Sequence, residues 1–574
     1  MRLADFLGVT CEPLEMPDVA GQHVAFLRSA LPNSDSCLAL NPSVWEDWAA
    51  GNCLSLELVS FLRTTYRYLL VYATRPRDFH SNFVAALSEG QLRGVKKLQG
   101  SAVSYEISPD SQDICESFSG LSFGPASQLN DHVFLCMQNS AAQKLILIDG
   151  ETFMAALRRE ESSIFFIGSD DVVDLDARLD NGWLLRNFSR LLPYAMALRH
   201  IFGEECWRPV EKHASVIVDD PLLRRNYGFL NFERLLGMMQ EHYFQTTVAF
   251  IPYNFRRSSR SVAKMFRQNG AHLSLCFHGN DHTDAEFAGC DKIKLNTMLQ
   301  TAEQRMQRHQ ELTGIHCDRV MVFPQGKFSI EAMAALKSRS FDAAVNTMPN
   351  PWGQEGTNLT ISDLAHPAIL RYAGYPLFLR MSCENTQEVN IAFNLFFGKP
   401  ILIVEHHDIF KNEQRIIDVV TRINSIAPDI HWSNLGTAVS CSTQQRREPN
   451  GDIRVRAYAR TIRISNRLES RVRFIVEWRD PEEETSVKEV LRNGAVYEFS
   501  ANGDGIHTDL SLEPGTSEEL SLVLQRSDFR FAEERLMGRG RVFLRRRLSE
   551  LRDNYISKSQ ALTACAAALR RRLS

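Results

Sequence analysis

The stretch "LSLCFHGNDHTD", residues 273–284, joins an apolar, strand-like run to two histidines that stand four residues apart. The pair is His278 and His282. Histidine is a common metal ligand and also an ordinary turn residue, so the spacing alone leaves the role of the pair open. The sequence on either side of this stretch has to decide between the two.

Strand-like runs of the same kind recur on both sides of the histidine pair, and most are followed by a helical pattern such as "FLNFERLLGMMQEHYF". The runs cover residues 214–220, 246–252, 272–279, 319–326, 342–347 and 401–408. Regular alternation of strands and helices over this length predicts a full or partial (β/α) barrel. We place this barrel at residues 209–440.

The regions before and after the barrel differ from it in their pattern of apolar residues. In residues 1–208, continuous apolar runs at 68–73, 132–137, 144–149 and 163–168 favour an α/β, Rossmann-like domain with a parallel sheet covered on both faces. After residue 440 the apolar period changes to two, as in "RVRFIVEW", which predicts a small β-sandwich at residues 441–528. Residues 529–574 form an arginine-rich helical pattern, for which we expect a solvated or packing helix.

The overall composition restricts the class of protein. The chain has 574 residues, of which 44% are hydrophobic and 23% charged, as is typical of a soluble protein with several cores. A net charge of −4 gives no general attraction to nucleic acid, and no apolar run reaches the roughly 18 residues that a membrane span needs. The 12 cysteines lack a CxxC pair, which suits reduced thiols. We therefore expect a cytoplasmic protein. Whether it forms a homo-oligomer through its C-terminal regions is an open question at this point.

The ends of the barrel runs carry the residues that chemistry could use. Side chains at the carboxyl ends of barrel strands converge on one mouth. These ends hold three pairs: Asp219 with Asp220, His278 with His282, and His406 with His407. One aspartate and two histidines suit a divalent ion that keeps open positions for water and substrate. A second aspartate can then act as general base, and a histidine from the last strand can protonate the leaving group.

Four of these segments resemble motifs of the polysaccharide deacetylases, carbohydrate esterase family four, whose barrel is the NodB-homology domain. "VDDP" resembles the first motif, "HGNDH" the second, "FPQG" the third and "LIVEHHD" the fifth, over roughly residues 210–430. The resemblance implies a metal-dependent hydrolase that removes an acyl group, usually acetyl, from an N-acylated sugar or polysaccharide. It also implies a carbohydrate substrate and a divalent metal, with zinc as the expected ion.

The same resemblance assigns roles to individual residues. It implies that Asp219 is the general base and that Asp220, His278 and His282 hold the metal. It makes His407 the general acid, with His406 as the alternative. The residues expected to line the substrate groove are Pro324, Gly326, Asn346 and Trp352.

Two features depart from the family pattern. The first motif usually ends in glycine, whereas proline follows the two aspartates here. The arginine that normally precedes the third-motif proline and orients the base is replaced by Phe323, and Lys327 and Arg371 are the candidates to take its place. A second hypothesis is therefore a non-catalytic carbohydrate-binding or scaffolding protein that keeps the barrel and the metal site.

Overall fold

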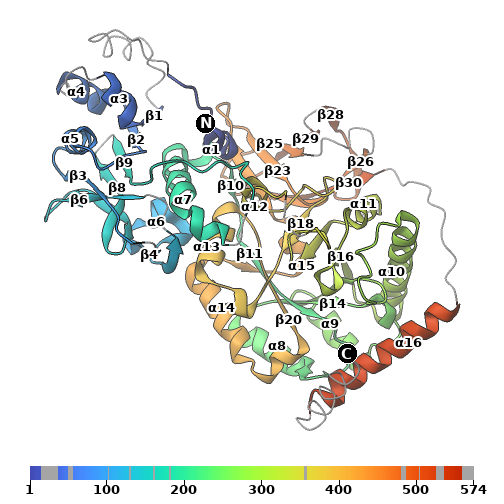
Figure 1. Cartoon of the computed structure of the whole chain (residues 1–574). Helices are drawn as coiled ribbons and strands as arrows, with labels where there is room; N and C mark the ends of the chain where they lie inside the picture. Colours follow the sequence, from blue (N-terminus) through green and yellow to red (C-terminus); the bar gives the residue numbers. More distant parts are fainter. Residues whose placement is uncertain are drawn as a thin grey trace. The chain divides into compact units, whose positions relative to one another are not determined.

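The structure is a computed structural model that comprises two compact units (Figure 1). One unit is Met1–Trp207 with Thr360–Ser362, and the other is Arg208–Leu359 with Asp363–Ser574. The first unit ends next to residue 208, where the sequence indicates a boundary. The described residues are 1–14, 36–48, 56–100, 102–127, 131–159, 162–179, 182–339, 341–354, 358–479, 487–502, 505–524 and 536–558.

The first unit contains a nine-stranded sheet in which β1-β2-β9-β8-β7-β4-β5 are successive neighbours and β3 and β6 pair beside this path. The strands are β1 (Cys37–Leu40), β2 (Tyr68–Val71), β3 (Leu92–Lys97), β4 (Ala102–Ile107), β5 (Ser122–Ser127), β6 (His132–Cys136), β7 (Gln143–Ile148), β8 (Glu151–Arg158) and β9 (Ser163–Ile167). Helix α5 (Asp78–Leu87) shares a buried core with this sheet, and α7 (Trp183–Phe202) ends the unit's helical part.

The prediction of a parallel, Rossmann-like sheet is wrong for most strand pairs of this unit. Among the described strands of this unit, the pairs β1–β2 and β2–β9 are parallel, and the other pairs are antiparallel. A tight hairpin joins β7 to β8 through Asp149 and Gly150, which have φ values of 50° and 80°. Positive φ at both central residues is what a two-residue hairpin turn requires, and Asp-Gly is a common sequence for it.

In the second unit, a parallel sheet has the strand order β18-β17-β16-β15-β14-β11-β20-β19, with β21 (His431–Trp432) beside β11. All six strands expected from the sequence are present. They are β11 (His213–Asp219), β14 (Thr246–Phe250), β15 (Leu273–His278), β16 (Cys317–Val322), β17 (Ala343–Asn346) and β20 (Ile401–His406). The helices around them include α8 (Phe232–His242), α9 (Arg260–Gln268), α10 (Lys292–Thr313), α11 (Ile330–Ser338), α13 (Glu388–Phe397) and α14 (Gln414–Ile426).

A short segment that the sequence pattern did not reveal brings the sheet close to a full barrel. Strand β18 (Leu377–Leu379) pairs with β17, and β19 (Met381–Ser382) pairs with β20. Only Arg380 separates these two edge strands. The two edges of the sheet are thus joined through consecutive residues, and Arg380 lies at the seam.

Two further sheets follow the barrel, as the period-two pattern predicts. One has the order β10-β22-β23-β25-β29-β28 and the other β24-β30-β26-β27. The strands are β10 (Arg208–Pro209), β22 (Thr443–Arg447), β23 (Ile453–Ala457), β24 (Thr461–Ser465), β25 (Val472–Trp478), β26 (Val487–Arg492), β27 (Ala495–Tyr497), β28 (Ser500–Asn502), β29 (Gly505–Leu512) and β30 (Ser517–Leu524). Pairing is antiparallel except between β23 and β25.

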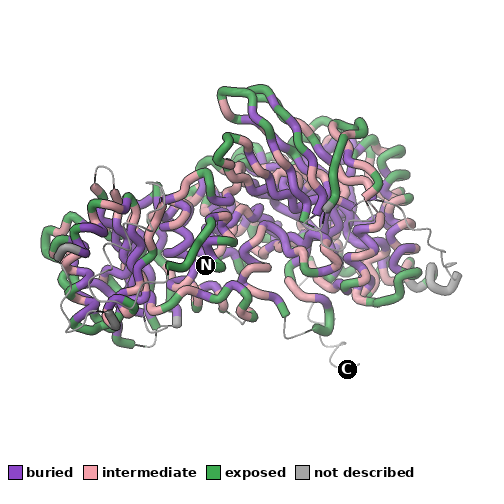
Figure 2. Tube along the Cα trace, turned by 90° about the horizontal axis from the view of Figure 1, so that it is seen from above, coloured by how far each residue is buried: buried purple, intermediate pink, exposed green. Residues whose placement is uncertain are grey.

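Barrel and sandwich share one hydrophobic core. The connecting helix α15 (Leu435–Ser440) contributes Leu435 and Val439, which are fully buried in the same cluster as Val320 of the barrel and Phe474 of the sandwich. Figure 2 shows buried residues in the interior and exposed residues on the outer helices and loops. The sandwich at 441–528 therefore packs within the barrel's own compact unit, and its independence as a domain stays a prediction.

The basic tail contains helix α16 (Leu536–Leu551) and a following π-helical turn, η8 (Arg552–Ile556). It contacts the barrel mouth: the Tyr227 hydroxyl donates to Asp553 at 2.9 Å, and the Gly228 N–H donates to the Asn554 side chain at 2.9 Å. Within the described residues 536–558 the tail thus packs as a helix, and residues 529–535 and 559–574 lie outside the described ranges. None of the helices in those ranges combines the length and apolar character needed to cross a bilayer.

Replacing Leu435 by alanine should destabilise barrel and sandwich together, because the cavity would open in the core that they share. Deletion of a buried leucine side chain typically costs about 2–5 kcal/mol. Urea unfolding followed by hydrogen exchange at both sheets measures this, with Leu544→Ala, at a residue 59% exposed on α16, as the control. Loss of protection in the sandwich alone would contradict a shared core.

Candidate metal centre

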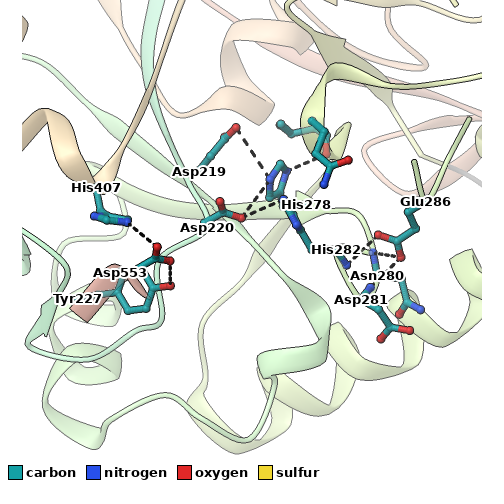
Figure 3. A network of polar contacts seen from close by, with 12 residues as sticks. Asp219, Asp220, Tyr227, His278, Asn280, Asp281, His282, Glu286, His407 and Asp553 are labelled. Carbon is teal, nitrogen blue, oxygen red and sulfur yellow. Dashed lines mark hydrogen bonds and ion pairs between the residues drawn. The ribbon is translucent and has the colours of Figure 1, made fainter. Parts of the chain in front are cut away.

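Three side chains expected to hold a metal converge at the carboxyl end of the barrel strands (Figure 3). Asp220 directly follows β11, His278 ends β15, and His282 lies in the loop after it. The Nε2 atoms of His278 and His282 are 3.4 and 3.2 Å from Oδ1 of Asp220. One potential ligand atom from each residue lies within 4.8 Å of the other two, so these residues could share one ion.

The orientation of these groups fits a divalent ion. Nδ1 of His278 is 3.1 Å from the carbonyl oxygen of Val322, which leaves Nε2 directed at Asp220. The buried Oδ1 of Asp220 faces the Nε2 atoms of His278 and His282 as ion pairs, without a well-formed hydrogen bond from a described residue. A histidine held through its second nitrogen by a backbone carbonyl and a carboxylate whose oxygen faces two imidazoles are the donors that zinc sites use.

The pKa shifts of two of the three residues, Asp220 and His282, favour metal binding. Burial lowers the pKa of His282 to about 4, so its imidazole is neutral near neutral pH. Burial would raise the pKa of Asp220, but His282 and His278 outweigh it and hold this pKa well below its usual range. Burial would lower the pKa of His278, yet Asp219 and Asp220 raise it. Metal ligands bind in their deprotonated form, so an ion would displace a proton from His278.

A buried carboxylate that the sequence did not reveal shapes the loop between the two histidines. Glu286 accepts hydrogen bonds from the backbone N–H groups of Asn280, Asp281 and His282, at 3.1, 2.7 and 2.8 Å. Burial raises the pKa of Glu286 to about 7. His282 has a φ of 55°, and a strained backbone of this kind persists only where surrounding contacts hold it.

The buried Asp219 forms an ion pair with Arg380 at the barrel seam. Nη1 and Nη2 of Arg380 donate to Oδ1 and Oδ2 of Asp219, each at 2.8 Å. Burial would raise the pKa of Asp219, but Arg380 and His278 outweigh it and lower this pKa. Arg380 therefore makes the contact for which the sequence suggested Lys327 or Arg371.

Neither of the two candidates named from the sequence, Lys327 and Arg371, pairs with Asp219. Nζ of Lys327 lies 3.4 Å from Asp284, and Nη1 of Arg371 lies 3.2 Å from Asp363. Both side chains are thus paired with carboxylates other than Asp219. A single sequence gives no sign of Arg380, because its partner is 161 residues away along the chain.

The residues expected to line a substrate groove separate into two groups. Pro324 packs against Gly279, where an added Cβ would lie 2.5 Å from the proline ring. The buried Asn346 donates from Nδ2 to the carbonyl of Gly326 at 3.0 Å, so its amide braces this wall. Trp352 is 56% exposed on a loop, with Nζ of Lys327 4.0 Å from its ring centroid. Asn346 thus supports the wall, whereas Trp352 is open to a ligand.

The two histidines after the last barrel strand point to different surroundings. His406 is the register partner of Asp219 in the neighbouring parallel strand and is exposed. His407 is buried, and its Nε2 lies 3.7 Å from Oδ1 of Asp553 in the tail. Its ring packs on Gly228, where a Cβ would be 2.1 Å from Nδ1. Figure 3 shows His407 and Asp553 as a pair apart from Asp220, His278 and His282.

A second group of potential ligands lies at the other end of β11, where the strand begins. It comprises Glu211, His213 and Cys441. The Glu211 carboxylate lies 2.7 Å from Nε2 of His213 and forms an ion pair with Arg467, so the group satisfies its own charges. We interpret it as a structural contact.

None of the known protein-family models matches this chain, and no curated protein is similar to it. Solved structures of carbohydrate deacetylases are similar to it. Agd3, described as a novel carbohydrate deacetylase, is 8% identical and covers 91% of this chain and 96% of its own, with a TM-score of 0.47. A family 4 carbohydrate esterase from Streptomyces lividans is 10% identical and covers 39% of this chain and 91% of its own, with a TM-score of 0.25.

A family 4 pseudoenzyme from Bacillus anthracis is also among the similar structures. It is 11% identical and covers 39% of this chain and 64% of its own, with a TM-score of 0.24. The similar structures thus include proteins described as enzymes and one described as inactive. At these identities and TM-scores we take no activity from the likeness, and the residues of the site have to support a function by themselves.

Purified protein should carry close to one divalent ion per chain, and both Asp220→Ala and His282→Ala should lose it, because each removes one ligand. Elemental analysis after reconstitution with zinc measures the content. His316→Ala, at an exposed histidine before β16, is the matched control and should keep the ion. Equal metal content in all variants would contradict a site at these residues.

Proposed function

We propose that this chain is a metal-dependent hydrolase that removes an acyl group, expected to be acetyl, from an N-acylated sugar or polysaccharide. The observation that carries the proposal is the combination of a His-His-Asp cluster with an adjacent buried Asp219–Arg380 pair. The cluster can hold an ion, and the pair supplies an ionised carboxylate beside it. A structural histidine cluster would need no such neighbour.

In this proposal Asp220, His278 and His282 hold the ion, which we expect to be zinc. When bound, such an ion supplies Lewis acidity at the barrel mouth. Asp219 accepts the proton of the attacking water as general base. Arg380 keeps Asp219 ionised, and its two parallel hydrogen bonds fix the plane of the carboxylate.

The proton for the leaving amine is proposed to come from a histidine after β20. The sequence alignment favours His407. The strand register instead supports His406, because it pairs with Asp219 and its charge contributes to the lowered pKa values of both aspartates. We therefore propose His406 as the general acid and keep His407, which lies beside Asp553, as the alternative.

The competing hypothesis is a carbohydrate-binding or scaffolding protein without turnover. Its main support was the missing third-motif arginine, and Arg380 now makes the contact expected of that residue. Acetate release from N-acetylated oligosaccharides by the zinc-loaded protein distinguishes the two. No release above a metal-free control, from oligosaccharides or from lipid-linked sugars, would favour the binding protein.

Asp219→Asn should slow acetate release by roughly 10²–10⁴-fold while the bound metal stays, since the change removes basicity but keeps the shape of the side chain. Arg380→Gln should also slow release, because the buried carboxylate would lose its counterion. Elemental analysis of the same samples separates loss of the base from loss of the ion. An unchanged rate for Asp219→Asn would mean that another group is the base.

His406→Ala should reduce turnover more than His407→Ala, and neither change should release the metal. Loss of a general acid typically costs about 10²–10⁴-fold. Comparing substrates that differ in leaving-group pKa checks the role, because a substrate with a good leaving group needs less protonation and should be less affected. A larger, leaving-group-dependent loss for His407→Ala would assign the acid to His407.

A further inference from the structure

A pocket of about 250 Å³ lies between the barrel and helix α16. Its aromatic walls are Tyr253, Phe255 and Phe543, and five arginines complete the lining. Typical pockets for drug-sized ligands have volumes of about 300–1,000 Å³, so this one suits a single small ring rather than an extended chain. None of its residues belongs to the proposed catalytic set.

Three of the arginines in the lining have carboxylate partners. Arg257 forms a bidentate ion pair with Glu550, in which Nη2 and Oε2 are 2.6 Å apart. Arg547 contacts the same glutamate at 3.7 Å. Arg305 donates to Asp281 at 2.5 Å. These three charges are therefore balanced, at least in part, by two carboxylates.

The other two arginines, Arg256 and Arg546, form no ion pair or hydrogen bond with any residue in the described part of the chain. Arg546 is only 5% exposed, and its Nε is buried without a hydrogen-bond partner. A buried donor without a partner is unfavourable, and Glu550, whose carboxylate interacts electrostatically with Arg546, is already paired with Arg257 and Arg547. The pocket therefore has the charge and the unsatisfied donor of an anion-binding site.

The aromatic rings add a second recognition element. The guanidinium of Arg256 lies 5.0 Å from the ring centroid of Phe255, and that of Arg547 lies 5.3 Å from Phe543. Arg305 is 5.4 Å from the ring of Tyr253. Aromatic faces carry negative partial charge and attract the weakly positive C–H groups of a saturated ring. A ligand that combines such a ring with an anionic group would satisfy both halves of the lining.

The pocket shares a loop with the candidate metal centre. The Tyr253 N–H donates to the carbonyl of Asn280 at 3.0 Å, and Arg305 donates to the Asn280 side chain at 2.7 Å. Asn280 lies between His278 and His282, whose Nε2 atoms face Asp220. A group bound in the pocket would thus sit beside the residues proposed to act on the acyl group.

We propose that this pocket binds an acidic sugar unit, a saturated sugar ring bearing a carboxylate or another anionic group, with the anion held by Arg546 and Arg256. The placement of this unit next to the acylated sugar rests on the proposed function, whereas its binding does not. The substrate would then be an acidic rather than a neutral glycan.

Calorimetric titration of the full chain tests this proposal with three probes. They are a tetrasaccharide of alternating glucuronic acid and N-acetylglucosamine, neutral N-acetylchitotetraose, and inorganic phosphate. The acidic tetrasaccharide should bind at least about tenfold more tightly than the neutral one, as one charge-assisted hydrogen bond implies. Arg546→Gln and Arg256→Gln should each remove this preference. Arg545→Gln, on the same helix but outside the lining, should keep it.

Three outcomes would overturn the proposal. They are equal affinity for the two tetrasaccharides, a preference that survives both arginine variants, and phosphate binding as tightly as the acidic sugar. Arg256 is exposed, so its variant should fold even if Arg546→Gln does not. Acetate release is measured separately: a binding preference without release would defeat only the proposed function, and release without a preference would defeat only the pocket.

Discussion

The ion pair between Asp219 and Arg380 is the contact on which the barrel mouth depends. Both side chains are almost fully buried, with exposures of 2% and 5%. Removing one partner from such a pair typically costs about 3–5 kcal/mol, because the other charge is left uncompensated. Since Arg380 stands alone between β18 and β19, the pair also ties the first barrel strand to the closing segment. Closure of the sheet and orientation of the carboxylate therefore depend on the same contact.

The candidate metal ligands depend on a different feature, a loop whose backbone is held by buried contacts. Asp220 and His282 both have left-handed backbone conformations, with φ values of 78° and 55°. Glu286 accepts hydrogen bonds from three backbone N–H groups of the loop. The ring of Pro324 packs against Gly279, which has no side chain in the way. A local strain of this kind is stable only when neighbouring contacts determine it completely. The Asp219–Arg380 ion pair and this loop meet at His278. Its Nε2 lies 3.9 Å from Oδ2 of Asp219 and 3.4 Å from Oδ1 of Asp220.

The sequence predicted those parts of this arrangement that depend on local pattern. Continuous apolar runs marked the six barrel strands, and the rule that strand ends meet at one mouth brought Asp220, His278 and His282 together. It could not reveal Arg380 or Glu286, because their roles come from contacts that no spacing encodes, across 161 residues in the case of Arg380. The N-terminal sheet differs from the expected parallel one because buried antiparallel strands carry the same continuous apolar runs as parallel strands, while the turn at Asp149 and Gly150 makes β7 and β8 antiparallel.

The position of α16 has a consequence for how the protein is made. Tyr227 and its partner Asp553, in η8 directly after α16, are 326 residues apart, so the candidate metal ligands leave the ribosome long before α16 does. A nascent or truncated chain would hold the ligand cluster but lack the wall that Phe543 and Arg546 supply. Under our proposals, selection among glycans would arise only after α16 has been synthesised and has packed against the barrel.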